Sequence, residues 1–304
     1  MFVHLNIHSV YSAMKGLLSL TDMIGLAKSH SMNTLALTDV NGIWGFIRFV
    51  QQCNNSDIQP IAGVNLITDK QEVVILVENQ PGYENLCRII SHVHDDHTQK
   101  ISDIIRKYSS GLFVLSYDAL TLKELQRSIP NTHLFIELRP GMEESVIQKL
   151  AKDLKLEIVA TGDVYFKSKK DHISHKILYA IDHNLTLEKV DPLGYKSDQH
   201  WFRNEEEMVK LFPNSLGALN NSRYLSDRCK TDWSFINTIF PGLSLKDTYR
   251  SNRELKNKVF EGAKKRYGNI NGDVRSRIEY ELNIITQKGF APYFLIVQDI
   301  VNQT

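Results

Sequence analysis

The sequence has little of what marks secreted or membrane proteins. Its three cysteines, Cys53, Cys87 and Cys229, are widely separated and form no C-x-x-C pair, so we expect free thiols in a reducing cytoplasm rather than a disulfide framework. No apolar run approaches the roughly 20 residues that a membrane span needs. The N-terminal MFVHLNIHSVYS has neither a basic leader nor a long apolar stretch, so it predicts no signal peptide. We therefore expect a cytoplasmic protein without a membrane partner.

An excess of charge of either sign is also missing. Lys and Arg number 36 and Asp and Glu 35, which weighs against this segment being the main nucleic-acid-binding part of any protein. The sequence contains no P-loop, no G-x-G-x-x-G and no Ser/His/Asp motif. What is present is 42% hydrophobic residues in 304, enough for one large α/β domain or two smaller ones.

Short apolar runs alternate with helical patterns over the first half of the chain. The predicted strands cover 2–8, 34–38, 60–68, 73–77, 112–115, 133–138 and 157–161. Predicted helices lie at about 20–30, 43–53, 83–90, 118–127 and 143–154, the first with Ser19 as its N-cap. Strands separated by helices indicate βαβ units and a mainly parallel sheet, open or closed into a barrel.

Beyond about residue 200 the pattern becomes mainly helical. Helices are predicted at 205–208, 215–229, 251–267 and 275–288, and Pro241-Gly242 breaks the chain, so a domain boundary is expected near 235–245. The apolar block Tyr293–Val297 follows the last helix. Uncovered, such a block favours self-association, unless it folds back on the helix at 275–288.

Polar residues follow several predicted strands, where functional side chains gather in parallel α/β proteins. They are His8, Asp39, Asn65, Asp118 and Asp163, and a His with three carboxylates could bind zinc or manganese. Other interpretations stay open: Asp39 and Asp163 suit turns, and Asp118 suits a helix N-cap.

A second cluster, His92, His94 and His97 with Asp95 and Asp96, also contains residues that can bind metals. Its spacing fits no closed metal site, so a solvated helix end or loop is favoured.

Several motifs together resemble those of one family. The opening HLNIHSVYS at 4–12, followed by Gly16-Leu17, is similar to the H-L-x-x-H-S-x-Y-S start of the PHP domain of bacterial DNA polymerase III alpha subunits. Further stretches match in the family's order: ALTD at 36–39, QPIAG at 59–63, GYENL at 82–86, GLFVLS at 111–116, ATGDVY at 160–165 and GFAPYFLIV at 289–297. The last stretch resembles the run that enters the polymerase palm.

The resemblance implies an α/β fold, a distorted (β/α)7 PHP barrel over 1–238, followed by a mainly helical segment at 239–304 that begins the polymerase core. The parent would be a DNA-directed DNA polymerase, a nucleotidyltransferase that uses Mg. Its catalytic aspartates belong to the palm, further along the chain. We therefore expect a fragment without cofactor that extends no primer.

The family's nine metal-ligand positions are only partly kept here. They correspond to Asn6, His8, Asp39, Val40, Asn65, Glu72, Asp118, Asp163 and Tyr165. His8, Asp39 and Asp163 survive, whereas the other imidazoles are lost and Val40 cannot coordinate a metal. Losing even outer-shell support weakens metal affinity 10–100-fold. We expect a degenerate pocket without catalytic metal, in which Asn6 and Asn65 donate to the remaining carboxylates.

Three functions remain open at this stage. The leading one is a non-catalytic scaffold of a replicative polymerase, which by family analogy contacts the rest of the alpha chain, reaches DNA through the full-length protein and docks the proofreading exonuclease. The alternative is a metal-dependent PHP phosphoesterase or exonuclease using His8, Asp39, Glu72, Asp118 and Asp163. The third is a regulatory paralogue without a polymerase body.

Overall fold

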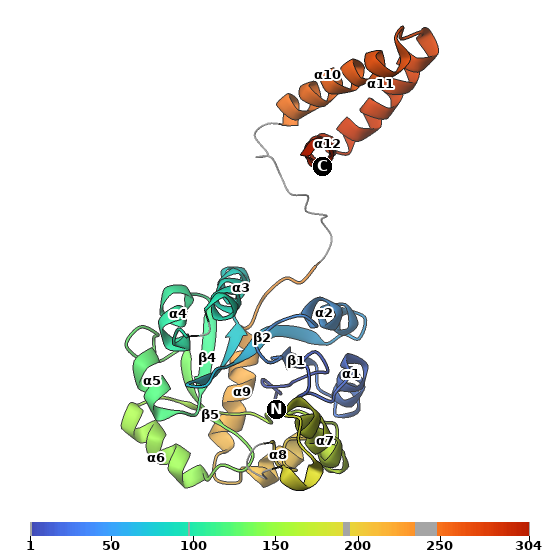
Figure 1. Ribbon diagram of the computed structural model, residues 1–304. Coiled ribbons are helices and arrows are strands. Elements are labelled where there is room, and N and C mark those ends of the chain that lie inside the picture. The colour runs from blue at the N-terminus through green and yellow to red at the C-terminus, as the bar shows by residue number, and fades with distance from the viewer. Residues whose placement is uncertain (1, 97, 191–194, 235–247, 304) are drawn as a thin grey trace. The chain divides into compact units, whose positions relative to one another are not determined.

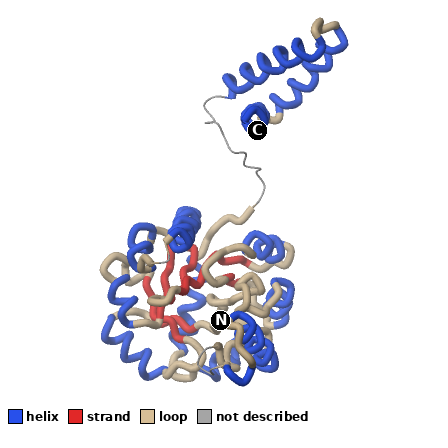
Figure 2. Tube along the Cα trace, in the orientation of Figure 1, coloured by secondary structure: helices blue, strands red, loops and turns tan. Residues whose placement is uncertain are grey.

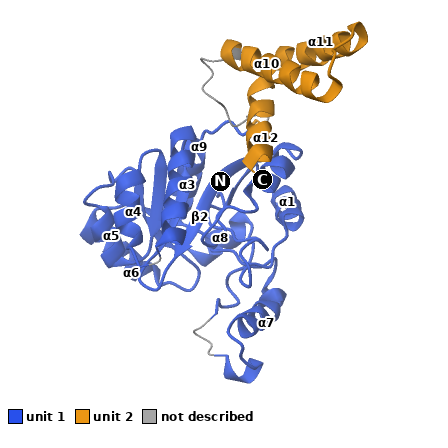
Figure 3. Cartoon of the chain, turned by 45° about the horizontal axis from the view of Figure 1, so that its top comes forward, with its two compact units in different colours: residues 1–233 blue, residues 234–304 orange. Residues whose placement is uncertain are grey.

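The computed structural model describes residues 2–96, 98–190, 195–234 and 248–303. The chain divides into two compact units, Met1–Trp233 and Ser234–Thr304 (Figure 3). The predicted break at Pro241-Gly242 and the predicted boundary between residues 238 and 239 lie outside the described residues, so both stay predictions.

Unit 1 is built on a curled sheet of six strands in the order β1-β2-β3-β4-β5-β6 (Figures 1 and 2). The strands are β1 (Thr34–Leu37), β2 (Gln59–Ile67), β3 (Glu72–Val77), β4 (Leu112–Ser116), β5 (Leu134–Leu138) and β6 (Ile158–Ala160). Three neighbouring pairs are parallel, but β3 runs antiparallel to β2 and β4. The turn at 68–71 is too short for the crossover that a parallel strand needs. The mainly parallel sheet is thus confirmed, with one reversed strand.

The N-terminal segment extends this sheet at its β1 edge. Ile7 forms a parallel bridge with Val164, which follows β6. On its other side the carbonyl oxygens of His4 and Ile7 accept hydrogen bonds from Ala36 (3.1 Å) and Thr38 (2.9 Å) at β1. The predicted first strand is therefore an irregular segment that pairs on both sides. Together with the six strands it gives the distorted PHP-type α/β architecture expected.

Helices surround the sheet, with α9 (Leu216–Arg228) in the middle of its curl (Figure 1). The others are α1 (Leu20–Ser29), α2 (Phe46–Asn54), α3 (Gln80–Asp95), α4 (Ile101–Tyr108), α5 (Ala119–Leu125), α6 (Glu144–Leu154), α7 (His172–Asp182) and α8 (Glu205–Leu211), with short 3-10 turns at Lys169–Asp171 and Leu187–Lys189. The predicted cap of α1 is confirmed, because Ser19 Oγ accepts from Asp22 N at 3.0 Å. Of these helices, α4 and α7 were not predicted from the sequence.

Apolar side chains fill both faces of the sheet. The larger cluster joins the strands to the surrounding helices. A second cluster includes Leu76 of β3, Phe113 of β4 and Phe135 of β5, with Leu225 of α9 packed against them. Polar side chains are instead concentrated where the parallel strands end.

Unit 2 is a group of three helices, α10 (Thr248–Tyr267), α11 (Gly272–Gln287) and α12 (Ala291–Gln303). Its small core contains Leu255, Leu282, Ala291 and Leu295. The predicted apolar block lies in α12, so it does fold back within the unit through Leu295. None of the described helices is long and apolar enough to cross a membrane.

Candidate functional site

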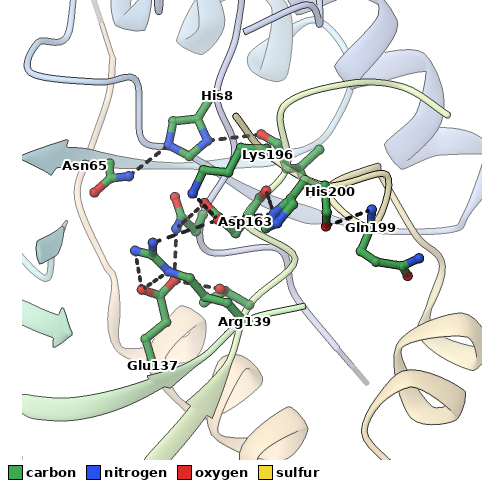
Figure 4. Close-up of polar contacts among 12 residues, drawn as sticks. His8, Asn65, Glu137, Arg139, Asp163, Lys196, Gln199 and His200 are labelled. Carbon is green, nitrogen blue, oxygen red and sulfur yellow. Dashed lines mark hydrogen bonds and ion pairs between the residues drawn. The ribbon is translucent and has the colours of Figure 1, made fainter. Parts of the chain in front are cut away.

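Charged side chains meet at the end of the sheet where the parallel strands finish (Figure 4). Arg139 follows β5, and Asp163 follows β6. Glu72 begins β3, and because β3 is antiparallel its first residue lies at this same end. Arg139 is 3% exposed and Asp163 is fully buried. Buried charges are rare unless they are paired, so their partners define the site.

Arg139 lies at the centre of this cluster. Its Nη1 donates to Glu72 Oε1 at 2.5 Å, and its Nε donates to Glu137 Oε2 at 2.7 Å. Nη1 also lies 3.9 Å from Asp163 Oδ2, and the guanidinium covers the Tyr117 ring at 4.7 Å. The planar guanidinium suits several carboxylates at once. A single cation therefore links three carboxylates.

Asp163 has a second cation, Lys196, whose Nζ donates to Oδ2 at 2.7 Å. His200 Nδ1 lies 3.2 Å from the same oxygen and 3.0 Å from the Asp163 carbonyl. The Lys196 ammonium also lies 4.9 Å from the centre of the Tyr165 ring. Asp163 adopts a positive φ of 42°, as the predicted turn role allows. Its carboxylate is thus surrounded by donors from the 195–200 segment and from β5.

Two asparagines complete the hydrogen bonding. Asn6 Nδ2 donates to Glu137 Oε1 at 2.9 Å and to Asp163 Oδ1 at 3.3 Å. Asn65 Nδ2 donates to Glu72 Oε1 at 3.1 Å. The prediction that these amides donate to carboxylates is confirmed.

His8 acts here as a neutral hydrogen-bonding side chain. Its Nδ1 donates to the Val164 carbonyl at 3.1 Å, which leaves Nε2 to accept from Asn65 at 3.2 Å. Its ring stacks on Tyr165 with a centroid distance of 3.9 Å. Burial lowers the pKa of His8 to about 3, so the imidazole is uncharged at neutral pH. Both ring nitrogens are occupied by protein groups.

Asp39 has different partners from the other carboxylates. Its Oδ1 accepts from Ser9 N at 2.7 Å and from Ser12 Oγ at 2.7 Å, and Ser9 Oγ lies 2.9 Å from Oδ2. Burial raises the pKa of Asp39, although these hydrogen bonds oppose the rise. Val40 lies beside it, in a backbone bridge with Asn65. The Asp39 carboxylate therefore accepts hydrogen bonds from Ser9 and Ser12 and does not pair with Arg139.

The remaining candidates lie elsewhere. Asp118 Oδ2 accepts from Thr121 N at 2.7 Å, so Asp118 is the N-cap of α5, as the alternative interpretation held. His92 contacts the Tyr108 hydroxyl at 3.1 Å, and His94 contacts the Asn41 carbonyl at 2.6 Å. His97 is outside the described residues. Within 2–96, 98–190, 195–234 and 248–303, no group of three His, Cys, Asp or Glu side chains is arranged to hold a metal ion.

Mutual attraction keeps the central groups charged. Burial alone would raise the pKa of Asp163, but Lys196 and Arg139 hold it well below its ordinary value. Burial also opposes the charge of Glu72, yet Arg139 and Lys196 lower the pKa of Glu72. The carboxylates in turn overcome burial and raise the pKa of Arg139 well above its usual range. Ion pairing outweighs desolvation for all three.

A cavity of about 380 Å³ reaches this cluster from the surface. Its lining includes Glu72, Tyr165 and Lys196 of the site, together with Lys15 and His175. Burial lowers the pKa of His175 to about 4, so its imidazole is neutral. The cluster is therefore reachable by a small solute.

Two family models match parts of this chain. Residues 4–123 match the PHP domain model, and residues 253–304 match the model of the bacterial DNA polymerase III alpha NTPase domain. The chain thus contains a PHP domain and part of a bacterial DNA polymerase III alpha NTPase domain. The PHP match covers β1 to β4, and the second match covers most of unit 2.

Relatives match over almost the whole chain. An error-prone DNA polymerase of Symbiobacterium thermophilum is 27% identical over 99% of this chain and 32% of its own length. The DNA polymerase III subunit alpha of Buchnera aphidicola subsp. Acyrthosiphon pisum is 29% identical over 99% of this chain and 30% of its own length. This chain thus spans about a third of the relatives it matches.

One solved structure, a two-domain Bacteroides vulgatus protein containing a predicted PHP-like metal-dependent phosphoesterase, aligns over 54% of this chain and 52% of its own, with 13% identity. Its TM-score is 0.40.

The sequence analysis missed four members of the cluster. Glu137 and Arg139 stand two residues apart at the end of the predicted strand 133–138. Two residues of opposite charge stand two positions apart at the end of an otherwise apolar strand, so their side chains face the same side. This pattern could have predicted an ion pair at the end of the sheet. Lys196 and His200 come from an irregular segment, and no spacing or periodicity marks them.

Proposed function

We propose that unit 1 is a non-catalytic PHP domain that serves as a structural scaffold of a DNA polymerase III alpha subunit. The observation that supports this most strongly is the pairing of the site's carboxylates with the protein's own cations. Arg139 lies 2.5 Å from Glu72 Oε1 and Lys196 lies 2.7 Å from Asp163 Oδ2, and the family resemblance assigns both carboxylates to metal-ligand positions.

The donor set also fits a metal cluster poorly. The positions to which the motif resemblance assigns metal ligands include Asn6, Val40, Asn65 and Tyr165. Burial raises the pKa of Tyr165 well above its ordinary value, so its phenol stays protonated. His8 already uses both ring nitrogens. Metal ions that clamp attacking and leaving oxygens require deprotonated, available ligands.

The same contacts have a structural role. They connect the N-terminal segment through Asn6, β3 through Glu72, β5 through Glu137 and the end of β6 through Asp163. Removing one partner of a buried ion pair typically costs about 3–5 kcal/mol. Such a network stabilises one arrangement of the curled sheet, as a scaffold requires.

A metal-dependent phosphoesterase is the second candidate, favoured by the cavity beside Glu72 and Lys196. The test is hydrolysis of p-nitrophenyl phosphate and of single-stranded DNA, with added zinc or manganese. The scaffold proposal expects no turnover above a protein-free blank. Turnover that is lost in Asp163→Asn but kept in Lys100→Met would reject it in favour of the phosphoesterase.

Polymerisation, with Mg as cofactor and DNA as partner, is proposed for the parent subunit and not for this chain. Two-ion nucleotidyl transfer needs carboxylates of the palm, and we expect no template-dependent incorporation by this chain alone. A replication role also implies a cytoplasmic location. Incorporation by a pure preparation on a primed template would contradict this assignment.

We also propose α7 as the surface that docks the proofreading exonuclease. Ile173, Ile177 and Ile181 recur every four residues and are 56%, 41% and 61% exposed. Residues at this spacing share one helix face, and a contiguous exposed apolar face is typical of interaction sites. Ile177→Asp should abolish co-elution with the exonuclease subunit, whereas Leu120→Asp, on another helix and 73% exposed, should not. If both variants lost co-elution equally, α7 would not be the docking surface.

A further inference from the structure

We propose that Arg139 and Lys196 are built-in counter-cations that stand in for metal ions, and that removing both converts the cluster into a site for a divalent cation. The inference rests on the proposed non-catalytic role and adds to it. It predicts that the carboxylates of the cluster would bind a divalent cation if Arg139 and Lys196 did not neutralise them.

Charge balance is the first argument. Glu72, Glu137 and Asp163 contribute −3, and Arg139 and Lys196 contribute +2, which leaves −1. Without the two cations the buried cluster would carry −3. Buried carboxylates at close range must then take up protons or a cation, because isolated buried charge is costly.

Convergence of oxygens is the second argument. Three atoms of the two cations lie close to three carboxylates: Arg139 Nη1 to Glu72 (2.5 Å), Arg139 Nη2 to Glu137 (2.6 Å) and Lys196 Nζ to Asp163 (2.7 Å). These carboxylates come from three different segments of the sheet, so the fold itself holds them in place. Carboxylate oxygens are the ligands that manganese and magnesium prefer.

Neighbouring groups can orient the oxygens of such a site. His200 Nδ1 is 3.2 Å from Asp163 Oδ2, and Asn6 and Asn65 donate to Glu137 and Glu72. The cavity beside Lys196 would admit an ion and water. Carboxylate oxygens suit Mn²⁺, which is therefore the probe.

The two cations should contribute unequally. Arg139 is 3% exposed and contacts all three carboxylates, whereas the side chain of Lys196 is 26% exposed and forms its ion pair with Asp163. Water can partly replace Lys196 but cannot reach Arg139 as easily. We expect Lys196→Met to weaken the exclusion of Mn²⁺ slightly and Arg139→Met to weaken it strongly.

The experiment compares wild type, Arg139→Met, Lys196→Met and the double variant of the full chain. Binding of Mn²⁺ is measured by equilibrium dialysis, and thermal unfolding is followed with and without MnCl2. The wild type should neither bind Mn²⁺ stoichiometrically nor shift its Tm. The double variant should bind Mn²⁺ and gain about 5–10 °C, the effect of a ligand at about a hundred times its Kd.

Two controls isolate the site. Lys100 Nζ pairs with Glu124 at 2.7 Å, the same distance as Lys196 to Asp163, but on the surface. Lys100→Met should therefore create no Mn²⁺ response. Adding Asp163→Asn to the double variant should remove the response, because one of the three carboxylates is then lost.

If the double variant does not fold, a second comparison still tests the counter-cation role. Glu137→Gln combined with Arg139→Met removes one charge of each sign, so it should unfold at a higher temperature than Arg139→Met alone. An equal or lower Tm would overturn the counter-cation role.

The two proposals fail in different ways. A folded double variant that binds no Mn²⁺, beside a wild type that binds none, overturns only the counter-cation proposal. Stoichiometric Mn²⁺ in the wild type, together with phosphatase turnover, overturns the non-catalytic role itself.

Discussion

Unit 1 and unit 2 place their charges in opposite ways. In unit 1, Arg139 and Asp163 are buried and pair within the core of the site. In unit 2 the ion pairs lie on helix surfaces, such as Arg275 with Glu279 on α11. Buried pairs are costly to break, whereas surface pairs contribute little. Ion pairs therefore contribute to the stability of unit 1 from its interior, whereas the ion pairs of unit 2 lie on its surface and contribute little.

Arg139→Met should have the largest effect of any single change. It leaves the buried Glu137 and the partly buried Glu72 without their main cation, which we expect to cost about 3–5 kcal/mol of unfolding free energy. Arg139→Lys should recover less than half of that, because an ammonium cannot serve several carboxylates with a fixed fork. Urea unfolding of unit 1 measures both. A loss below about 1 kcal/mol, the level of a surface pair, would erase the contrast between the units.

As pH falls, unit 1 should begin to lose stability at a higher pH than unit 2. Burial lowers the pKa of His4 to about 4 and that of His8 to about 3. A histidine that stays neutral when folded takes up a proton on unfolding, so stability is lost as pH falls from about 6.5 towards these values, on the order of 3 kcal/mol for each. All 11 histidines lie between residues 4 and 200, outside unit 2.

The carboxylates add a second step at lower pH. The depressed pKa of Asp163 means that its contribution is complete above the unfolded value of about 3.9 and is lost only below it. Thermal unfolding between pH 7 and 3 tests the order. His4→Gln should flatten the curve between pH 6.5 and 4; an unchanged curve would contradict the histidine account.

Much of the fold was predictable because short apolar runs and caps are local signals. The strands of unit 1, the Ser19 cap and the Asp118 cap all follow from neighbouring residues. The reversal of β3 was not anticipated, although the short turn before it was a hint.

The site was only half predictable for a related reason. Sequence order locates the ends of strands, but it does not say which side chains converge there. Asp39 and Asp163 both follow predicted strands, yet one contacts serines and the other contacts Arg139 and Lys196. Lys196 comes from an irregular segment about 30 residues beyond Asp163, and only the folded chain brings them together.

The outer face of α12 offers a smaller test of the contrast. Phe294 and Val297 are 42% and 40% exposed, whereas Leu295 between them is 6% exposed. Phe294→Ser with Val297→Ser should reduce self-association, measured by light scattering, and change the unfolding free energy by less than about 0.5 kcal/mol. Leu295→Ala should instead cost about 2–5 kcal/mol. If the double serine variant self-associated as strongly as the wild type, this face of α12 would not mediate self-association.

The smallest effect is expected for the surface pairs of unit 2. Arg275 Nε lies 3.1 Å from Glu279 Oε1, four residues away on α11, and both side chains are more than half exposed. Arg275→Gln should change the unfolding free energy by no more than about 0.5 kcal/mol. A loss comparable to that of Arg139→Met would show that burial does not explain the difference between the units.

The central claim is that the protein's own cations, not metal ions, neutralise Glu72, Glu137 and Asp163. The most direct test is elemental analysis of the wild-type chain purified without chelator. The account predicts zinc, manganese and iron far below one equivalent per chain. Stoichiometric metal that survives dialysis, and is lost in Asp163→Asn, would contradict it.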